Sequence, residues 1–169
     1  MGKKNQLPNS SFEQATVPGW PDYYRYSGAL LRPTERIGGA SEVWGVDTKQ
    51  PYHGDSCLRM SCGASHRATY IEYTIDPALT PKATPFVLST WLRANRDGVG
   101  AILYVSGAGS AKRFSLTKQW QRYSLPVTLP AQTSYLVIRW YQNQNQENDV
   151  LWMDALQLEV GDTPTDYLP

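Results

Sequence analysis

The sequence predicts an all-β protein, a two-sheet antiparallel β-sandwich of the jelly-roll type. Thirteen Gly and 12 Pro residues divide the 169-residue chain into short segments. The segments between these breaks are rich in Val, Ile, Thr, Tyr and Trp, which favour strands, and their apolar residues do not recur at helical spacing. With 41% hydrophobic residues the chain can bury the core of one domain.

The breaks define eleven expected strands. In chain order they are Ser11–Val17, Tyr23–Tyr26, Glu42–Asp47, Cys57–Cys62, Thr69–Asp76, Phe86–Ala94, Ala101–Ser106, Arg113–Leu116, Gln121–Leu129, Tyr135–Tyr141 and Leu151–Val160. The polar tract 142–148, QNQNQEN, lies between the last two and is interpreted as a connecting loop. Residues 7–169 are predicted to form the single domain, and residues 1–6 an N-terminal extension that need not belong to it.

Alternation along three of these strands assigns their faces, because successive side chains of a strand point to opposite sides. In 86–94 Arg93 is costly to bury without a partner, so Trp91 and Arg93 are expected outside together with Val87 and Ser89. Leu88, Thr90 and Leu92 then face the core. The same reasoning places Ile71, Tyr73, Ile75, Leu136, Ile138 and Trp140 inside, and leaves Tyr70, Glu72, Thr74, Tyr135, Val137, Arg139 and Tyr141 outside.

The outward faces thus combine aromatic rings with charged groups. The candidate binding set is Tyr70, Glu72, Trp91, Arg93, Arg139 and Tyr141. Sugar rings have apolar C–H faces and a girdle of hydroxyls, so a saccharide site needs flat rings for stacking and polar heads for hydrogen bonds. The alternative interpretation is that these aromatics fill a second contact between sheets or between a loop and a sheet, with the charges forming surface pairs.

The charge and hydropathy of the sequence give no sign of a nucleic-acid or membrane partner, and the cysteine spacing gives no sign of a disulfide. The net charge is +1, which gives no electrostatic reason to expect nucleic acid or an anionic membrane. No apolar run approaches the roughly 20 residues of a membrane span, and the start MGKKNQ lacks the apolar core of a signal peptide. Cys57 and Cys62 would lie on opposite faces of one strand, about 16 Å apart, and are predicted to be free thiols.

Several stretches together resemble the signatures of jelly-roll carbohydrate-binding modules of the group that contains families four, nine, sixteen and twenty-two. They are LPNSSFEQ, GWPDYY, WGVDTKQPYHGDSCLRM, FVLSTWLRANRDG, QWQRYSLPVTLP and VLWMDALQLEVGDTPTDY. Each is short and degenerate, but their order and spacing are specific, and they cover nearly the whole chain. The resemblance implies a β-sandwich that binds glycans without altering them and is appended to secreted polysaccharide-degrading enzymes.

The resemblance also implies a structural calcium ion. Its matched ligands are Glu13 in NSSFE, Ser56 or a neighbouring backbone carbonyl in HGDSCLRM, and Asp154 in WMDALQLE. Calcium accepts several oxygens and mixes carboxylates with carbonyls. From the pattern alone, a single Glu and a distant Asp would not indicate a metal.

Family four modules bind along a groove on the concave sheet, and the resemblance places Glu72 and Arg139 at matching positions. The sequence departs from the family where the groove aromatic is expected, since Thr69 is nearest, with Tyr70 beside it. Other members of the group bind at loop tips, which makes Tyr23, Tyr24 and Tyr26 a reserve site. Trp20, Trp44, Trp120 and Trp152 match architectural positions, and Trp152 shares the parity of core residues.

These observations favour a monomeric, non-catalytic module that binds a polysaccharide or oligosaccharide and directs an appended catalytic domain to it. An extracellular location is expected, with the chain as an excised module without its signal peptide. A structural or adhesion domain, as in a phage tail fibre, is the alternative. A glycan-degrading enzyme is a further one, although Glu72 is the single carboxylate that can be assigned to the groove and hydrolysis needs a pair.

Overall fold

The computed structural model of the chain describes residues 4–7, 9–14, 25–26, 44–61, 69–74, 76–105, 107–141, 146 and 148–168. This part contains ten strands and one short 3-10 helix. They are β1 (Arg25–Tyr26), β2 (Trp44–Asp47), β3 (Cys57–Ser61), β4 (Thr69–Thr74), η1 (Pro77–Leu79), β5 (Thr84–Ala94), β6 (Val99–Val105), β7 (Ser110–Leu116), β8 (Gln121–Leu129), β9 (Tyr135–Tyr141) and β10 (Val150–Val160). None of the helical structure described is long and apolar enough to cross a membrane.

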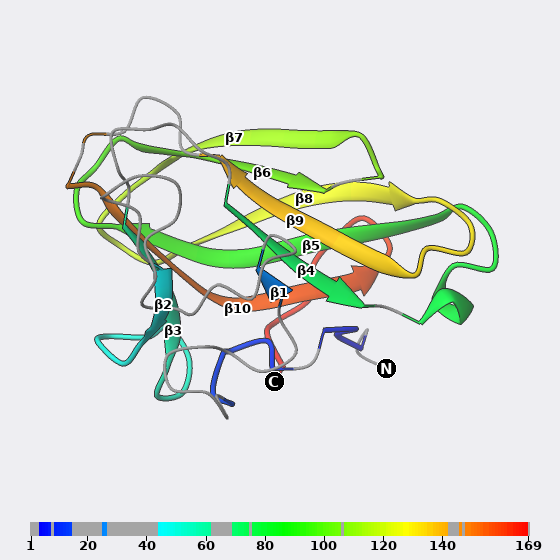
Figure 1. Ribbon diagram of the computed structural model, residues 1–169, viewed down its shortest axis with the longest axis horizontal. Helices are drawn as coiled ribbons and strands as arrows, with labels where there is room; N and C mark the ends of the chain where they lie inside the picture. Colours follow the sequence, from blue (N-terminus) through cyan, green and yellow to red (C-terminus); the bar gives the residue numbers. More distant parts are fainter. Residues whose placement is uncertain are drawn as a thin grey trace.

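The strands form two five-stranded sheets, with the orders β1-β4-β9-β6-β7 and β2-β3-β10-β5-β8. All eight strand pairings are antiparallel. In Figure 1 the long strands of both sheets run along the length of the molecule, one sheet in front of the other. The predicted all-β sandwich is therefore confirmed.

Most strands lie where alternation and the Gly and Pro breaks place them, and β8 and β9 have the predicted bounds. The first predicted strand is wrong for residues 11–14, because residues 9–12 form a turn and 13–14 follow it. Phe12 N–H donates to the Asn9 carbonyl oxygen at 3.0 Å, and the Asn9 side chain accepts from Gln14 N–H. Asn9 and Phe12 have φ angles of 48° and 61°, which a strand excludes. Residues 15–17 lie outside the described part.

The core lies between the sheets. Its largest fully buried side chains include Phe86, Leu88 and Leu92 of β5 and Leu103 of β6. Thr90 is buried as well, and its hydroxyl donates to the Asp154 carbonyl oxygen at 2.9 Å. The predicted inward set of β5 is thus confirmed. The corresponding side chains of β4 and β9 are not among those that the structure describes.

The outward face of β5 is covered in part by the end of the chain, which corrects two predictions. Val87 and Ser89, expected at the surface, are both fully buried. Residues 161–168 turn back across this sheet: Gly161 N–H donates to the Pro85 carbonyl oxygen, and Gln157 Nε2 donates to that of Asp166. The outward face of this sheet is open only beyond this covering segment.

Trp152 corrects the parity expected for β10. The register of β10 against β5 shifts between Asp154 and Gln157, and Ala155 within the shift has φ 50°. Such a bulge adds one residue and reverses which parity faces inward. Leu151 and Met153 before the bulge, and Leu156 and Leu158 after it, are in the core, whereas Trp152 is half-buried on the opposite face.

The N-terminal segment belongs to the domain from residue 5 onwards, so the predicted boundary at residue 7 is too late. Gln6 N–H donates to the Leu158 carbonyl oxygen at 2.9 Å, and Leu158 N–H donates to Asn5 Oδ1 at 3.0 Å. Leu156 N–H donates to the Ser10 carbonyl oxygen. In Figure 1 this blue segment accordingly lies beside β10 and the red C-terminal segment.

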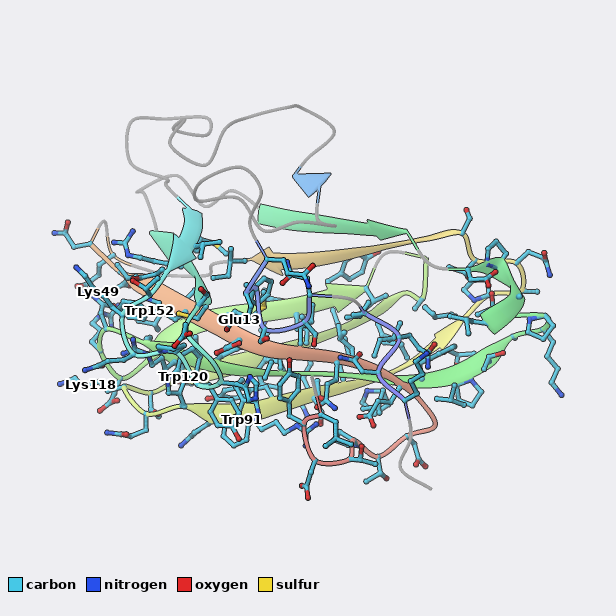
Figure 2. The ribbon with its side chains drawn as sticks, turned by 90° about the horizontal axis from the view of Figure 1, so that it is seen from below. Glu13, Lys49, Trp91, Lys118, Trp120 and Trp152 are labelled. Atoms are coloured by element: carbon cyan, nitrogen blue, oxygen red, sulfur yellow. The ribbon has the colours of Figure 1, made fainter. Side chains whose placement is uncertain are left out.

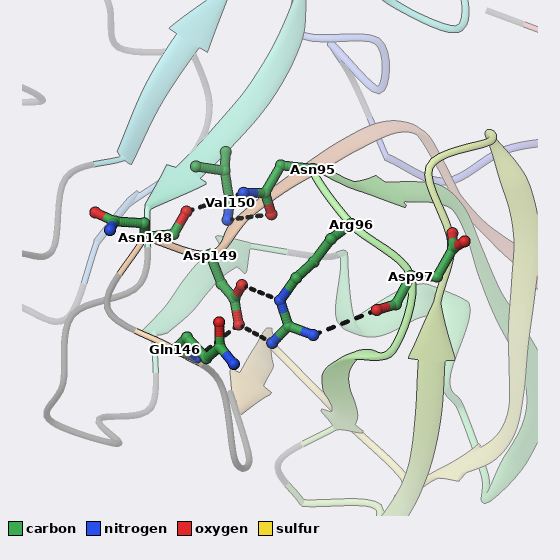
Figure 3. Close-up of polar contacts among 7 residues, drawn as sticks. All are labelled: Asn95, Arg96, Asp97, Gln146, Asn148, Asp149 and Val150. Atoms are coloured by element: carbon green, nitrogen blue, oxygen red, sulfur yellow. Dashed lines mark hydrogen bonds and ion pairs between the residues drawn. The ribbon is translucent and has the colours of Figure 1, made fainter.

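The described end of the polar tract 142–148 is fixed to the turn after β5. Arg96 makes two 2.6 Å hydrogen bonds to the Asp149 carboxylate, and Asn95 donates to Asn148 O and accepts from Val150 N–H (Figure 3). Asp149 also accepts from Gln146 N–H. The interpretation of 142–148 as a link between β9 and β10 agrees with the strands on either side.

Candidate functional site

The structure divides the predicted binding set between two sheets. Tyr70 and Glu72 lie on β4, and Arg139 and Tyr141 on the neighbouring β9. Trp91 and Arg93 lie on β5 of the other sheet. The outer faces of two packed sheets point in opposite directions. The six residues therefore do not share one surface, and the expectation that they do was wrong.

Four of the six remain together, and the register aligns them with a residue that the sequence reasoning missed. Tyr70 pairs with Arg139, and Arg139 pairs on its other side with Tyr104 of β6. We call Tyr70, Arg139 and Tyr104 the Arg139 row. Tyr104 is half-buried between fully buried Leu103 and Val105, so the alternation of VGAILYV was the signal that could have identified it.

Two further pairings extend this row along the sheet. Glu72 pairs with Val137 of β9 and with Arg25 of β1. Tyr141 pairs with Ile102, which pairs with Arg113 of β7. Directly opposed residues of antiparallel strands are about 5 Å apart. Three tyrosines, three arginines and a glutamate thus occupy neighbouring register positions of one sheet.

The reserve loop site is described for one of its three residues. Tyr26 lies on β1 and pairs with Ile71 of β4, at the edge of the sheet that carries the Arg139 row. Tyr23 and Tyr24 lie outside the described residues. Tyr26 therefore belongs to the same sheet as the main candidate site, but its register position beside Ile71 has the opposite parity to Glu72.

The three predicted metal ligands are gathered by the loop between β2 and β3, and we call Glu13, residues 52–56 and Asp154 the carboxylate cradle. Glu13 accepts from the backbone N–H groups of Asp55 and Ser56 at 3.1 Å. Asp154 Oδ2 accepts from Tyr52 and His53 N–H at 2.8 and 2.9 Å. Gly54 lies against Glu13, since a Cβ atom there would be 2.3 Å from Glu13 Oε1.

Asp154 is fully buried, and burial raises its pKa to about 7, with the Glu13 charge adding to the rise. The backbone N–H groups of His53, Ala155 and Tyr52 act in the opposite direction. Neither Asp154 nor Glu13 takes part in a salt bridge within the described part of the chain. The cradle therefore concentrates negative charge and has neutral donors in place of a cation.

The cradle's donor chemistry suits a hard cation such as calcium. A carboxylate offers about four lone pairs, and Asp154 Oδ1 and Glu13 Oε2 each accept one N–H in the described contacts. Among the described residues no cluster of three or more His, Cys, Asp or Glu side chains could hold a metal. Further ligands would thus be backbone carbonyls or waters, which calcium accepts readily.

Trp91 and Arg93 lie beside aromatic residues from outside the predicted set. The Tyr52 ring stacks on Trp91, with centroids 3.9 Å apart and planes 13° apart. The Arg93 guanidinium lies over the rings of Trp152 and Trp120, at 4.2 and 5.1 Å from their centroids. The prediction that Trp120 and Trp152 are architectural fits these contacts.

No protein-family model and no curated protein matches the chain. Solved structures match it over almost its whole length. The structure "TmCBM61 in complex with beta-1,4-galactotriose" superposes with a TM-score of 0.63 and 15% identity, covering 94% of this chain and 99% of that one. The CBM22-1 xylan-binding domain of Paenibacillus barcinonensis Xyn10C gives a TM-score of 0.61 and 14% identity, with 96% and 98% covered. The predicted resemblance to jelly-roll carbohydrate-binding modules is thus confirmed as a likeness of fold.

A larger protein contains the same fold. The enzymatically active domain of tailspike protein 4 of bacteriophage CBA120 matches with a TM-score of 0.57 and 14% identity. The match covers 93% of this chain and 21% of that one. The fold therefore occurs in a domain of Xyn10C and in a phage tailspike protein.

Proposed function

We propose that the chain is a non-catalytic module that binds a polysaccharide or oligosaccharide on its β1-β4-β9-β6-β7 sheet. The Arg139 row is the observation that carries the proposal, because it aligns a phenol, a guanidinium and a second phenol across three neighbouring strands. Phenol rings stack on the C–H faces of sugars, and guanidinium groups donate several hydrogen bonds to their hydroxyls. Glu72 and Tyr141 extend the site along the sheet.

The fold supports this proposal. Two of the modules that it matches over nearly their whole lengths are described as a galactotriose complex and a xylan-binding domain. A neutral polysaccharide also suits a chain whose net charge is +1. An accessory role in a secreted enzyme, where the module raises the local concentration of the glycan, belongs to the same proposal.

Calorimetric titration with soluble galactan, xylan, glucan and mannan tests the proposal. We expect binding to at least one of them, weakened about tenfold or more by Arg139→Ala or Tyr104→Ala as a hydrogen-bonded or stacked contact is lost. Lys82→Ala, at an exposed position before β5, is the matched control and keeps the wild-type affinity. Absence of heat with every glycan, from protein with an intact melting transition, would refute the proposed function.

We also propose that the carboxylate cradle holds a structural calcium ion through Glu13, Asp154 and a backbone carbonyl near Ser56. The buried, unpaired Asp154 supports it, because a buried carboxylate without a cation is costly. The ion would join the N-terminal segment, the 52–56 loop and β10, with no part in any reaction. Elemental analysis of protein dialysed against calcium, with Asp154→Asn as the comparison, tests this.

The adhesion hypothesis is favoured by one observation, the match to the tailspike domain. Such a role would combine the same sandwich with assembly into a larger particle. Analytical ultracentrifugation combined with glycan titration distinguishes the glycan-binding module from the structural domain. A monomer that binds glycan supports the module, whereas a stable trimer without glycan binding supports the structural domain.

A further inference from the structure

The sheet opposite the Arg139 row carries a second collection of flat side chains. We call Tyr52, Trp91, Arg93, Trp120 and Trp152 the aromatic shelf. They come from the 48–56 loop, β5, the segment before β8, and β10. Figure 2 shows the three tryptophans on one side of the molecule, with Lys49 and Lys118 at the same end.

The shelf is layered. Tyr52 covers one face of Trp91, and the Trp120 ring meets Tyr52 edge-on at 6.3 Å and 64°. Arg93 lies over both Trp120 and Trp152. Aromatic pairs and cation–π contacts of this kind stabilise one another in a fixed geometry.

Hydrogen bonds to the 47–50 segment fix the shelf from the side. Trp120 Nε1 donates to the Gln50 carbonyl oxygen at 3.1 Å, and Arg93 donates to that of Lys49 at 3.1 Å. Trp152 Nε1 donates to Asp47 Oδ2 at 2.9 Å. A ligand that meets these rings therefore finds them already ordered, which lowers the entropic cost of binding.

The shelf is open to solvent at Tyr52. Tyr52 is 38% exposed, and the other large hydrophobic side chains that are exposed in the described part are aliphatic, Val160 and Leu168. Beneath it, Trp91 Nε1 and Arg93 Nε are buried without a hydrogen-bond partner. These two atoms are shielded from solvent, so Tyr52 is the most exposed ring of the shelf.

Four cationic side chains lie on or beside the shelf, and its nearest carboxylate, Asp47, accepts from Trp152 and is paired with Arg59. Lys49 and Lys118 are exposed, and Arg93 and Arg122 are half-buried. None of the four takes part in a salt bridge with a described carboxylate, since the two salt bridges found there join Arg59 to Asp47 and Arg96 to Asp149. An acidic ligand would meet unpaired ammonium groups next to an exposed ring.

We propose that the aromatic shelf is a second saccharide-binding surface and that its ligand is a chain of hexuronate units. The C–H face of a pyranose can stack on Tyr52 while its carboxylate, carried at the ring's edge, reaches Lys49 or Lys118. This surface is separate from the site of the proposed function, because the two sheets face opposite ways. The module can therefore hold two glycan chains at once.

Titration with tetragalacturonate, and with the same tetrasaccharide after carboxyl reduction, tests the second surface. We expect the acidic form to bind at least about tenfold more tightly at low salt, and this preference to shrink in 0.5 M NaCl because salt screens exposed charges. Lys49→Gln combined with Lys118→Gln removes the preference, and Tyr52→Ala weakens the binding of both forms. Lys82→Gln is the charge-matched control and leaves the preference intact.

Arg139→Ala separates the two proposals. The proposed second surface requires that this variant bind tetragalacturonate as the wild type does, even where binding of neutral glycan is lost. Failure of tetragalacturonate to bind folded wild-type protein, or loss of its binding with Arg139→Ala and not with the double lysine variant, would overturn the inference. Binding of a sulfated galactan alone would overturn it too.

Discussion

Asp149 and Asp154 are both almost completely buried, at 2% and 0% exposure, yet their surroundings differ. Asp149 forms a two-pronged ion pair with Arg96, with both N–O distances 2.6 Å. Among the described residues the hydrogen bonds to Asp154 come from backbone N–H groups alone, those of Tyr52, His53 and Ala155. Within the described residues the chain pairs one buried carboxylate with a cation and gives the other none. The Arg96–Asp149 ion pair is complete within the protein, whereas Asp154 has the electrostatics of an ion site.

The largest effect is expected from breaking the complete pair. Arg96→Ala leaves Asp149 buried without its cation, which costs about 3 kcal/mol of unfolding free energy, at the low end of the range for such losses because Arg96 is partly exposed. Urea denaturation measures it. Arg113→Ala, which alters an exposed arginine on β7, is the control. If Arg96→Ala lowers the unfolding free energy as little as the control does, the ion pair does not stabilise the fold.

Calcium should act on the other carboxylate. At a hundredfold excess over its dissociation constant an ion bound only by the native state adds about 2.7 kcal/mol, visible as a higher melting temperature that EDTA reverses. Asp154→Asn should lose this response. Asp149→Asn should be less stable and keep it, so an equal loss in both variants would argue against a site at Asp154.

A substitution at Gly54 tests how tightly the 52–56 loop packs against Glu13 in the carboxylate cradle. Gly54→Ala would place a Cβ atom 2.3 Å from Glu13 Oε1 at a φ of +67°, and we expect a loss of about 2 kcal/mol from the combined backbone strain and overpacking. Gly109→Ala is a matched control, because it has φ +64° and nothing within 4 Å of the added atom. Equal destabilisation of the two variants would mean that backbone strain alone accounts for the loss, without a contribution from the contact with Glu13.

The unpaired charge also predicts a pH dependence in EDTA. The pKa of Asp154 is raised from 3.8 to about 7, so the stabilisation from its protonated form is complete below pH 4 and is lost as the pH rises through about 7. Between pH 6 and 8 this amounts to about 1 kcal/mol. The difference in unfolding free energy between wild type and Asp154→Asn isolates it, and a pH-independent difference would contradict the raised pKa.

The smallest effect concerns a neighbouring thiol. Burial, with the charges of Asp154 and Asp47 adding to it, raises the pKa of Cys57 to about 12, so its thiolate is scarce at neutral pH. We expect iodoacetamide at pH 8 to modify Cys57 only after denaturation. Trypsin cleaves after Arg59 and thereby separates Cys57 from Cys62 for mass spectrometry, and rapid labelling of the native Cys57 peptide would contradict the burial.

Alternation and turn residues were sufficient to predict the sandwich and most strand bounds, because these depend on local sequence. They could not predict which strands share a sheet, since hydrogen bonding between β4 and β9, or between β10 and β5, joins residues far apart in the chain. This is why Trp91 and Arg93 were grouped with Arg139. The correct outward placement of Trp91 and Arg93 did not depend on that pairing.

The other errors have local causes that alternation does not detect. The bulge at Ala155 reverses the parity of β10, so a pattern carried back from Leu156 and Leu158 places Trp152 on the wrong face. The left-handed residues Asn9 and Phe12 convert an expected strand into a turn. The approach of Glu13, Ser56 and Asp154 is expected from the family resemblance alone, because nothing in their spacing along the chain predicts it.

The pairing of residues 5–10 with β10 has a consequence for solubility. β3 pairs with β10 only from Val150 to Met153, and beyond that point Asn5, Gln6 and Ser10 take up the hydrogen bonds of Leu156 and Leu158. Without them this stretch would be an uncapped strand edge, able to recruit a strand from another molecule. The N-terminal residues thus cover this strand edge, and we expect them to reduce self-association through it.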